Sequence, residues 1–246
     1  MTLAFLLYLA AGAFAGGFVN GLAGFGTALF ALGFWLQIMP PAQAVAVVVA
    51  MSVVSGAQGV WVVRRDIQRA RLLRFLIPAL VGVPAGVGLL ALIDVEALKL
   101  VIAGFLMLYG GFFLVNRNLP HLRERTPVMD SIIGAVGGVL GGAAGLSGAL
   151  PTMWCALKDW TKGEKRALFQ PFNLSVLGLT VAFLAVRGEY TVETLTVMAA
   201  ALPVTIVSAQ AGIFVFKRLS DAQFRTLLIA LLFISGATLM FRTLAL

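Results

Sequence analysis

The chain contains the same glycine-rich apolar segment twice. Residues 16–29 read GGFVNGLAGFGTAL and residues 137–150 read GGVLGGAAGLSGAL, an offset of 121 positions. The apolar stretches that follow each copy recur in the same order, so each copy opens one half of the chain. Glycine-interrupted apolar segments at matching positions of two halves are typical of membrane carriers built from internal repeats, and they point to the binding site.

The hydrophobicity of the chain places this duplicated pattern in a membrane. Hydrophobic residues make up 61% of the 246 residues and charged residues only 11%, and the mean hydropathy is +1.01. A soluble domain of this composition would lack a polar surface. We therefore predict an all-α integral membrane protein. Apolar stretches long enough to cross about 30 Å of hydrocarbon lie at 42–63, 75–93, 97–115, 167–186, 195–216 and 226–244.

The basic residues indicate how the chain is oriented in the membrane. Most of the 18 lysines and arginines lie in four segments, 64–74, 117–125, 158–166 and 217–225. Cytoplasmic loops are enriched in Lys and Arg, so the net charge of +8 is interpreted as a topology signal rather than as a nucleic-acid-binding surface. This placement predicts that the N-terminus and the C-terminus both lie on the outer side, and that corresponding spans of the two halves run in opposite directions.

The same topology predicts that each glycine-rich segment forms a hairpin. Residues 128–158 lie between two basic segments, so this stretch enters and leaves the membrane on the cytoplasmic side, and residues 3–38 do so on the outer side. We therefore predict two inverted repeats, 1–116 and 129–246, joined by a cytoplasmic linker at 117–128. Each repeat is a broken or re-entrant hairpin followed by three transmembrane helices, about eight helical membrane elements in all. Because unpaired backbone amides are costly in lipid, the two hairpin tips should meet near the midplane.

Neutral polar groups are available at the predicted tips. All ten aspartates and glutamates lie in loops or at span ends, which disfavours a carboxylate-based cation site, and we expect neither a metal nor a cofactor. Broken helices instead offer backbone N–H groups and positive helix ends, which favour an anion. Asn173, at the position equivalent to Ser52, is our first choice for a ligand. The predicted substrate-binding residues are Asn20, Gly24, Phe25, Gly26, Thr27, Ser52, Ser55, Gly145, Leu146, Ser147, Gly148, Gln170 and Asn173.

Three basic residues flank the second hairpin on its predicted cytoplasmic side. Lys158, Lys165 and Arg166 are candidates for an electrostatic funnel that attracts an anion to the cytoplasmic mouth. The pairing of two halves of opposite orientation predicts alternating access of a small anion to a central site between them, with each hairpin as a gate or ligand arm.

Several of these features together resemble the sulfite exporter TauE/SafE family of bacterial inner-membrane transporters. They are the doubled glycine pattern, the chain length, the Arg-rich segment 64–74 and the polar FQPFNLS at 169–175. The resemblance covers essentially the whole chain. It implies a multi-pass protein of the bacterial inner membrane that transports, and exports, small sulfur-containing oxyanions such as sulfite or organosulfonates. The expected partners are this small anion and membrane lipid, with no nucleic acid, and the surplus of glycines also allows a homodimer.

Other interpretations of the same residues stay open at this point. An anion channel, or a carrier for other small organic anions, would use the same paired hairpins. Residues 145–148 also resemble the serine motif of rhomboid proteases, but a nucleophilic serine needs a base, and the only histidine, His121, lies in the predicted linker. We therefore predict that the protein is not an enzyme. Glycines spaced by four residues are also a general device for close helix packing in lipid.

Overall fold

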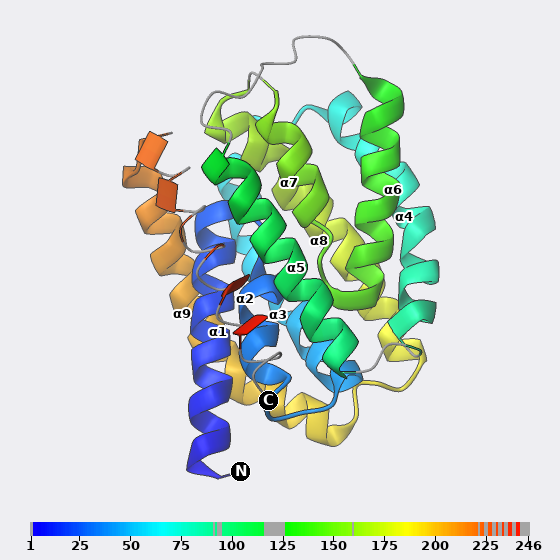
Figure 1. Ribbon diagram of the computed structural model, residues 1–246, viewed down its shortest axis with the longest axis vertical. Helices are drawn as coiled ribbons and strands as arrows, with labels where there is room; N and C mark the ends of the chain where they lie inside the picture. Colours follow the sequence, from blue (N-terminus) through cyan, green and yellow to red (C-terminus); the bar gives the residue numbers. More distant parts are fainter. Residues whose placement is uncertain are drawn as a thin grey trace.

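The computed structural model describes residues 2–90, 92, 95–115, 126–158 and 160–220, together with 222, 223, 226, 227, 230, 233, 236, 237, 240 and 241. This part of the chain is entirely helical, without strands (Figure 1). Its helices are α1 (Leu3–Ala23), α2 (Thr27–Trp35), α3 (Pro41–Val63), α4 (Arg69–Leu90), α5 (Val95–Val115), α6 (Pro127–Ala144), α7 (Ala149–Ala156), α8 (Lys162–Val186) and α9 (Val192–Arg218).

Six of the described helices, α1, α3, α4, α6, α8 and α9, are long and apolar enough to cross a membrane. This finding confirms the predicted multi-pass, all-α membrane protein. Helices α3, α4, α8 and α9 coincide with four of the predicted spans, and α5 coincides with the predicted span 97–115. Most of the predicted span 226–244, and the linker residues 117–125 with His121, lie outside the described residues.

Each glycine-rich segment forms a long helix, a break and a short helix. Helices α1 and α2 are separated by residues 24–26, and helices α6 and α7 by residues 145–148. The short helices have 9 and 8 residues, whereas α1 and α6 are themselves long enough to span a membrane. Each predicted broken hairpin thus has a short second arm and a long first arm. Most of the glycines in that arm do not break the helix, because they face a neighbouring helix at close range.

Glycine faces bring two helix pairs into backbone contact. Helix α1 packs along α9, and α6 packs along α4. A methyl group added at Gly21 would overlap the carbonyl group of Ala209 in α9, and one added at Gly138 would overlap the carbonyl group of Ala79 in α4. Small residues allow this approach, which gains van der Waals contact in a solvent where apolar side chains gain little by burial. Both pairs join a helix from the first half of the chain to one from the second half.

Helices α3 and α8 lie at the centre of this arrangement. They pack against each other, and residues 44–52 of α3 form a continuous buried run. Helices α1 and α9 flank α3, and α4 flanks α8. The polar residues of the middle of α3 and α8 therefore project into the protein interior rather than toward lipid.

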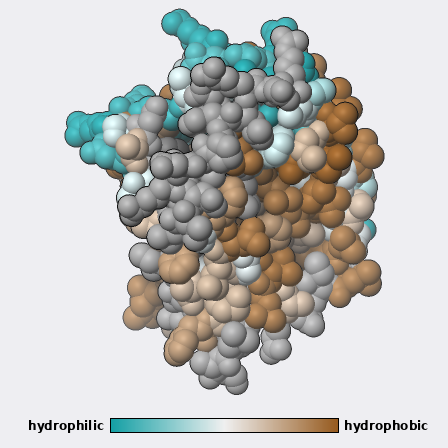
Figure 2. Space-filling model, turned by 45° about the horizontal axis from the view of Figure 1, so that its top comes forward, coloured by the Kyte–Doolittle hydropathy of each residue, from teal (hydrophilic) through white to brown (hydrophobic). Residues whose placement is uncertain are grey.

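The polar residues collect at one end of the molecule. Figure 2 shows hydrophilic residues at that end, with hydrophobic residues covering much of the remaining visible face. In Figure 1 the α3–α4 connection, the start of α8 and the end of α9 all lie at this end, whereas the N-terminus lies at the opposite end. The basic segments 64–74 and 158–166 thus share one end of the bundle, as the charge pattern predicts.

Candidate functional site

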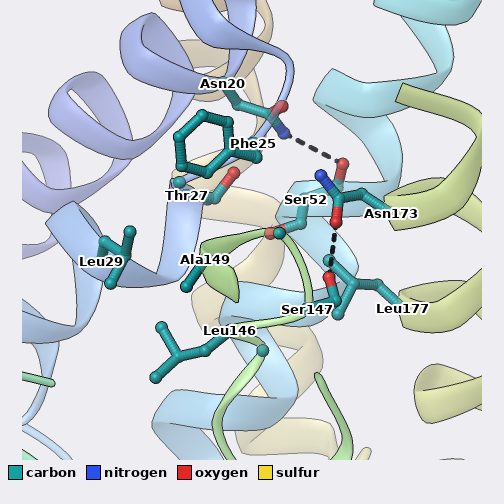
Figure 3. A pocket seen from close by; sticks show the side chains of 13 residues that line it. Asn20, Phe25, Thr27, Leu29, Ser52, Leu146, Ser147, Ala149, Asn173 and Leu177 are labelled. Atoms are coloured by element: carbon teal, nitrogen blue, oxygen red, sulfur yellow. Dashed lines mark hydrogen bonds between the residues drawn. The ribbon is translucent and has the colours of Figure 1, made fainter. Parts of the chain in front are cut away.

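The two breaks face each other across a small internal cavity (Figure 3). Its volume is about 10 Å³, which is room for about one water molecule. All of the predicted substrate-binding residues line it except Gly24, Ser55 and Gln170. The lining also includes three apolar residues that are not among the predicted substrate-binding residues. The full lining consists of Asn20, Phe25, Gly26, Thr27, Leu29, Ser52, Gly145, Leu146, Ser147, Gly148, Ala149, Asn173 and Leu177.

The first break depends on two glycines in the left-handed conformation. Gly24 has a φ of 84° and Gly26 a φ of 97°, values that cost an L-residue with a side chain roughly 1–2 kcal/mol. The Gly24 amide donates to the carbonyl oxygen of Asn20 (2.8 Å) and ends α1. Helix α2 then starts at Thr27, and no side chain of the described residues caps its first turn. Its first backbone N–H groups therefore form a positive helix end beside the cavity.

The second break is closed by its own backbone. Gly145, with a φ of 69°, donates its amide to the carbonyl oxygen of Gly141 (2.9 Å), and the amide of Leu146 donates to that of Leu140 (3.1 Å). The first of these bonds is the αL arrangement that commonly ends a helix at a left-handed glycine. Helix α7 follows after Gly148, and its start also has no side-chain cap among the residues described.

Asn173 of α8 connects the two breaks. Its Nδ2 donates to the carbonyl oxygen of Gly24 in the first break (3.0 Å), and its Oδ1 accepts from Ser147 Oγ in the second (2.7 Å). Figure 3 shows the Asn173 side chain beside Ser147, with the second of these bonds drawn. Asn173 and Ser147 are both buried. A single amide side chain thus fixes the distance between the two tips.

The opposite wall of the cavity contains two polar atoms without a partner. The Nδ2 atom of Asn20 donates to Ser55 Oγ (2.6 Å) and to the carbonyl oxygen of Ser52 (3.3 Å). Because the Ser52 carbonyl can only accept, the amide orientation of Asn20 is fixed. Asn20 Oδ1 and Thr27 Oγ1 are buried and have no hydrogen-bond partner in the described part of the chain. Unsatisfied buried polar groups are costly and are typical of a site that holds a ligand or water.

The remaining predicted ligands lie one contact away from the cavity. Ser55 accepts the bond from Asn20 and donates to the carbonyl oxygen of Met51 (2.8 Å). Gln170 is fully buried, and its Nε2 donates to the carbonyl oxygen of Gly56 (3.3 Å). Both side chains therefore support the wall of the cavity rather than form it.

The three predicted funnel residues are not at an open mouth. Lys158 is only 4% exposed, and its ammonium donates to Thr126 Oγ1 (2.7 Å) and lies over the Trp154 ring. Arg166 is 1% exposed and lies deeper, against the end of α1. Lys165 is partly buried. Their role as an anion funnel stays a prediction.

The three lining residues that sequence reasoning missed have ordinary apolar side chains. Leu177 lies one turn after Asn173 on α8, and Ala149 directly follows the second break. The i, i+4 spacing on α8 was the available signal for Leu177. Leu29 lies in the first turns of α2, and nothing in its type distinguishes it from its neighbours.

The site does not resemble a serine nucleophile with its base. The hydroxyl of Ser147 donates to an amide oxygen, which cannot take its proton. Of the described residues, no three His, Cys, Asp or Glu side chains form a group that could hold a metal ion. The arrangement can bind a small polar molecule through neutral donors and backbone amides.

The sequence matches the model of a known protein family over most of its length. The model of the family described as Sulfite exporter TauE/SafE matches residues 8–239. No curated protein matches the sequence. The family match spans both glycine-rich breaks and confirms the resemblance carried by the doubled glycine pattern.

Proposed function

Because the chain belongs to the sulfite exporter TauE/SafE family, a family of membrane transporters rather than enzymes, we propose that it is a secondary transporter that exports small sulfur-containing oxyanions. Sulfite and short organosulfonates are the substrates that we expect. The observation that carries this proposal is the meeting of two broken helices at one internal cavity with a neutral, polar lining.

The chemistry of the cavity favours an anion. The starts of α2 and α7 adjoin it, and each start directs backbone N–H groups and the positive end of a helix dipole toward it. The unpartnered hydroxyl of Thr27 is available as a further donor. All lining side chains are neutral, so a negative charge meets no like charge there. An oxyanion has several acceptor atoms and can take bonds from both breaks together.

The helix packing supports two inverted repeats at 1–116 and 129–246. At the offset of 121 positions α1 corresponds to α6, and at an offset of 126 positions, that of Gly212 from Gly86, α9 corresponds to α4, so the pair α1–α9 corresponds to the pair α6–α4. The contacts agree in detail. Gly212 of α9 faces the carbonyl group of Phe18 in α1, and Gly86 of α4 faces that of Val139, which is the counterpart of Phe18.

The small size of the cavity supports a mechanism of alternating access. Room for about one water molecule is too little for an oxyanion, so this conformation is occluded and the hairpins have to separate before a substrate enters. We propose that the two halves rock about the central site, with each break alternately exposed to one side. The basic end faces the cytoplasm of a bacterial cell, and the two termini face the outer side.

The proposal is tested by flux through purified protein in proteoliposomes. Sulfite or 2-hydroxyethanesulfonate is loaded inside, and its appearance outside is followed with and without an imposed pH gradient. We expect saturable flux that unlabelled substrate competes away, and the response to the gradient reports proton coupling. Absence of flux for sulfite and for a panel of sulfonates would overturn the substrate class.

Two alternatives are separated by the same assay. A carrier for other small organic anions would transport carboxylates but no sulfur oxyanion. An anion channel would give flux that does not saturate and that is not accelerated by substrate on the opposite side. Neither outcome would change the assignment of the cavity as the path of the anion.

A further inference from the structure

Arg166 is a buried cation at the end of the first glycine-rich helix. Its guanidinium donates to the carbonyl oxygens of Gly21 (2.7 Å) and Leu22 (3.4 Å), two groups of the last turn of α1 that have no partner within the helix. Its Nε donates to Gln170 Oε1 (3.3 Å), and the guanidinium lies 4.1 Å from the centre of the Phe216 ring. Only 1% of Arg166 is exposed.

The positive charge of Arg166 is only partly balanced. In the part of the chain that the structure describes, no aspartate or glutamate forms an ion pair with it, in contrast to Arg71, which pairs with Glu164 (3.5 Å). The negative end of the α1 dipole supplies about half a charge, and the face of an aromatic ring supplies a further modest attraction. A buried charge without a full counter-charge is costly, and an anion beside it would be stabilised.

The guanidinium also has donors to spare. It has five N–H groups in a planar fork, and the bonds to Gly21, Leu22 and Gln170 use three of them. The fork geometry of an arginine matches the oxygen atoms of an oxyanion better than a lysine ammonium does. Two N–H groups of the guanidinium are therefore left over for the oxygen atoms of an oxyanion.

Arg166 also lies on the line between the basic end and the central cavity. Lys162, Arg166, Gln170 and Asn173 follow one another at spacings of four, four and three residues along α8, so they share one face of this helix. Asn173 lines the cavity, and Arg166 lies seven residues before it, which is about 10 Å along the helix axis. The stem of Arg166 also adjoins Gly24 of the first break.

We infer that Arg166 forms a second anion-binding site, for a small oxyanion, between the basic end of the protein and the central cavity. This inference rests on the proposed function in one respect: the anion that binds at Arg166 is taken to be the anion that the protein transports. According to this inference, Arg166 binds only those anions that approach the central cavity from the basic end. A substrate that approaches from the opposite end reaches the central cavity without passing this residue.

The test compares the two directions of access. Arg166→Lys and Arg166→Gln are expressed, and the apparent KM for sulfite is measured in inside-out and in right-side-out membrane vesicles. We expect Arg166→Lys to raise the KM about tenfold for sulfite presented at the basic end, because a charged, bidentate donor is replaced by a point charge. The KM for sulfite presented at the opposite end should not change. Equal changes at both ends, or no change at either, would overturn the inference.

Arg187→Lys is the matched control. Arg187 also donates to a carbonyl oxygen in the last turn of a helix, that of Val87 in α4 (2.7 Å), but at the exposed opposite end of the bundle. If Arg166 only closed the end of α1, Arg166→Lys and Arg187→Lys would both lower the thermal unfolding midpoint. The KM for sulfite would then stay unchanged at the basic end and at the opposite end.

A direct binding measurement separates this inference from the proposed function. The thermal unfolding midpoint of the purified protein is followed as sulfite or sulfate is added. A rise in wild type and Arg187→Lys that is clearly smaller in Arg166→Gln supports the site, even if no flux of sulfite is found. The same rise in all three proteins, or no rise in wild type, overturns the site, even if flux is found.

Discussion

The two glycine-rich breaks occupy matching positions in the sequence but are held by different partners. The helix before the second break ends on bonds of its own backbone, from Gly145 and Leu146. The helix before the first break has one such bond, from Gly24, and its remaining carbonyl groups accept from Arg166 of α8. Asn173 of α8 adds a bond to the Gly24 carbonyl. The end of the helix before the first break is thus held by α8, whereas the end of the helix before the second break is closed by its own backbone.

Equivalent positions of the two breaks also differ in chemistry. Gly26 has a left-handed φ of 97°, and its counterpart Ser147 instead supplies a hydroxyl that donates to Asn173. Thr27 has an unpartnered hydroxyl, and its counterpart Gly148 leaves no space for a side chain beside Phe25. Each break therefore contributes one hydroxyl to the cavity, one committed to the protein and one available. The two copies of the segment have thus diverged. The hydroxyl of the second break is bonded to the protein, and the hydroxyl of the first break is available to a ligand.

The largest expected effect is a difference between alanine substitutions at the two left-handed glycines. In both variants the left-handed conformation of the alanine costs about 1–2 kcal/mol. At Gly24 the added carbon would lie 2.6 Å from Gln170 Oε1, whereas at Gly145 the nearest atom, Val49 Cγ1, is 3.1 Å away. We expect Gly24→Ala to abolish transport and Gly145→Ala to retain a measurable rate in the proteoliposome assay.

Gly178→Ala is the control for this pair. It lies in α8, and no described atom outside its immediate neighbours lies within 4 Å of the position of an added carbon. This variant should transport at the wild-type rate. Equal losses in Gly24→Ala and Gly145→Ala would show that the first break is not the more constrained one. Valine at either position should abolish transport while membrane insertion is retained.

A smaller effect is expected from cutting the connection between the breaks. Asn173→Ala leaves the Gly24 carbonyl and the Ser147 hydroxyl without their partner, at about 1–3 kcal/mol for each buried group that stays unsatisfied. We expect the apparent KM for substrate to rise about tenfold or more, with a lower unfolding midpoint. Ser147→Ala removes one of the two bonds and should have the smaller effect on both. An unchanged KM in Asn173→Ala would remove this residue from the site.

The smallest expected effect on stability belongs to Thr27→Val. The lost hydroxyl has no protein partner in the described structure, so the free energy of unfolding should be unchanged or rise by up to about 1 kcal/mol. The KM for substrate should still increase a few-fold, because a donor to the anion is lost. Thr180→Val, which removes a hydroxyl that donates to the Val176 carbonyl (3.0 Å), should instead lower stability and leave KM unchanged. A lower stability of Thr27→Val would show that the Thr27 hydroxyl does have a hydrogen-bond partner in the protein.

The positions of the breaks could be predicted from the sequence because duplication marks them. Gly24 and Gly145 match at the common offset, and both have a left-handed φ. The polar residues of α3 and α8 followed from the same comparison, with Ser52 and Asn173 at equivalent positions. Most of the cavity lining was therefore predictable from the sequence.

The lengths of the hairpin arms and the place of Arg166 could not be predicted in this way. A glycine inside a helix costs about 1 kcal/mol by propensity alone, and only the closeness of α9 and α4 explains why α1 and α6 continue through several of them. Arg166 is the last residue of the basic segment 158–166, and a basic segment indicates a loop. Its burial depends on the open end of α1, more than a hundred positions earlier in the chain.

The pairing of α1 with α9 also constrains how the protein is made. Gly17 and Gly21 pack against the backbone of Thr205 and Ala209, which most of the chain separates from them. During synthesis α1 enters the bilayer long before α9 exists, and its glycine face has only lipid as a neighbour until then. Such distant contacts form late and slow folding. The first hairpin, although synthesised early, therefore reaches its final packing only after α9 has been inserted.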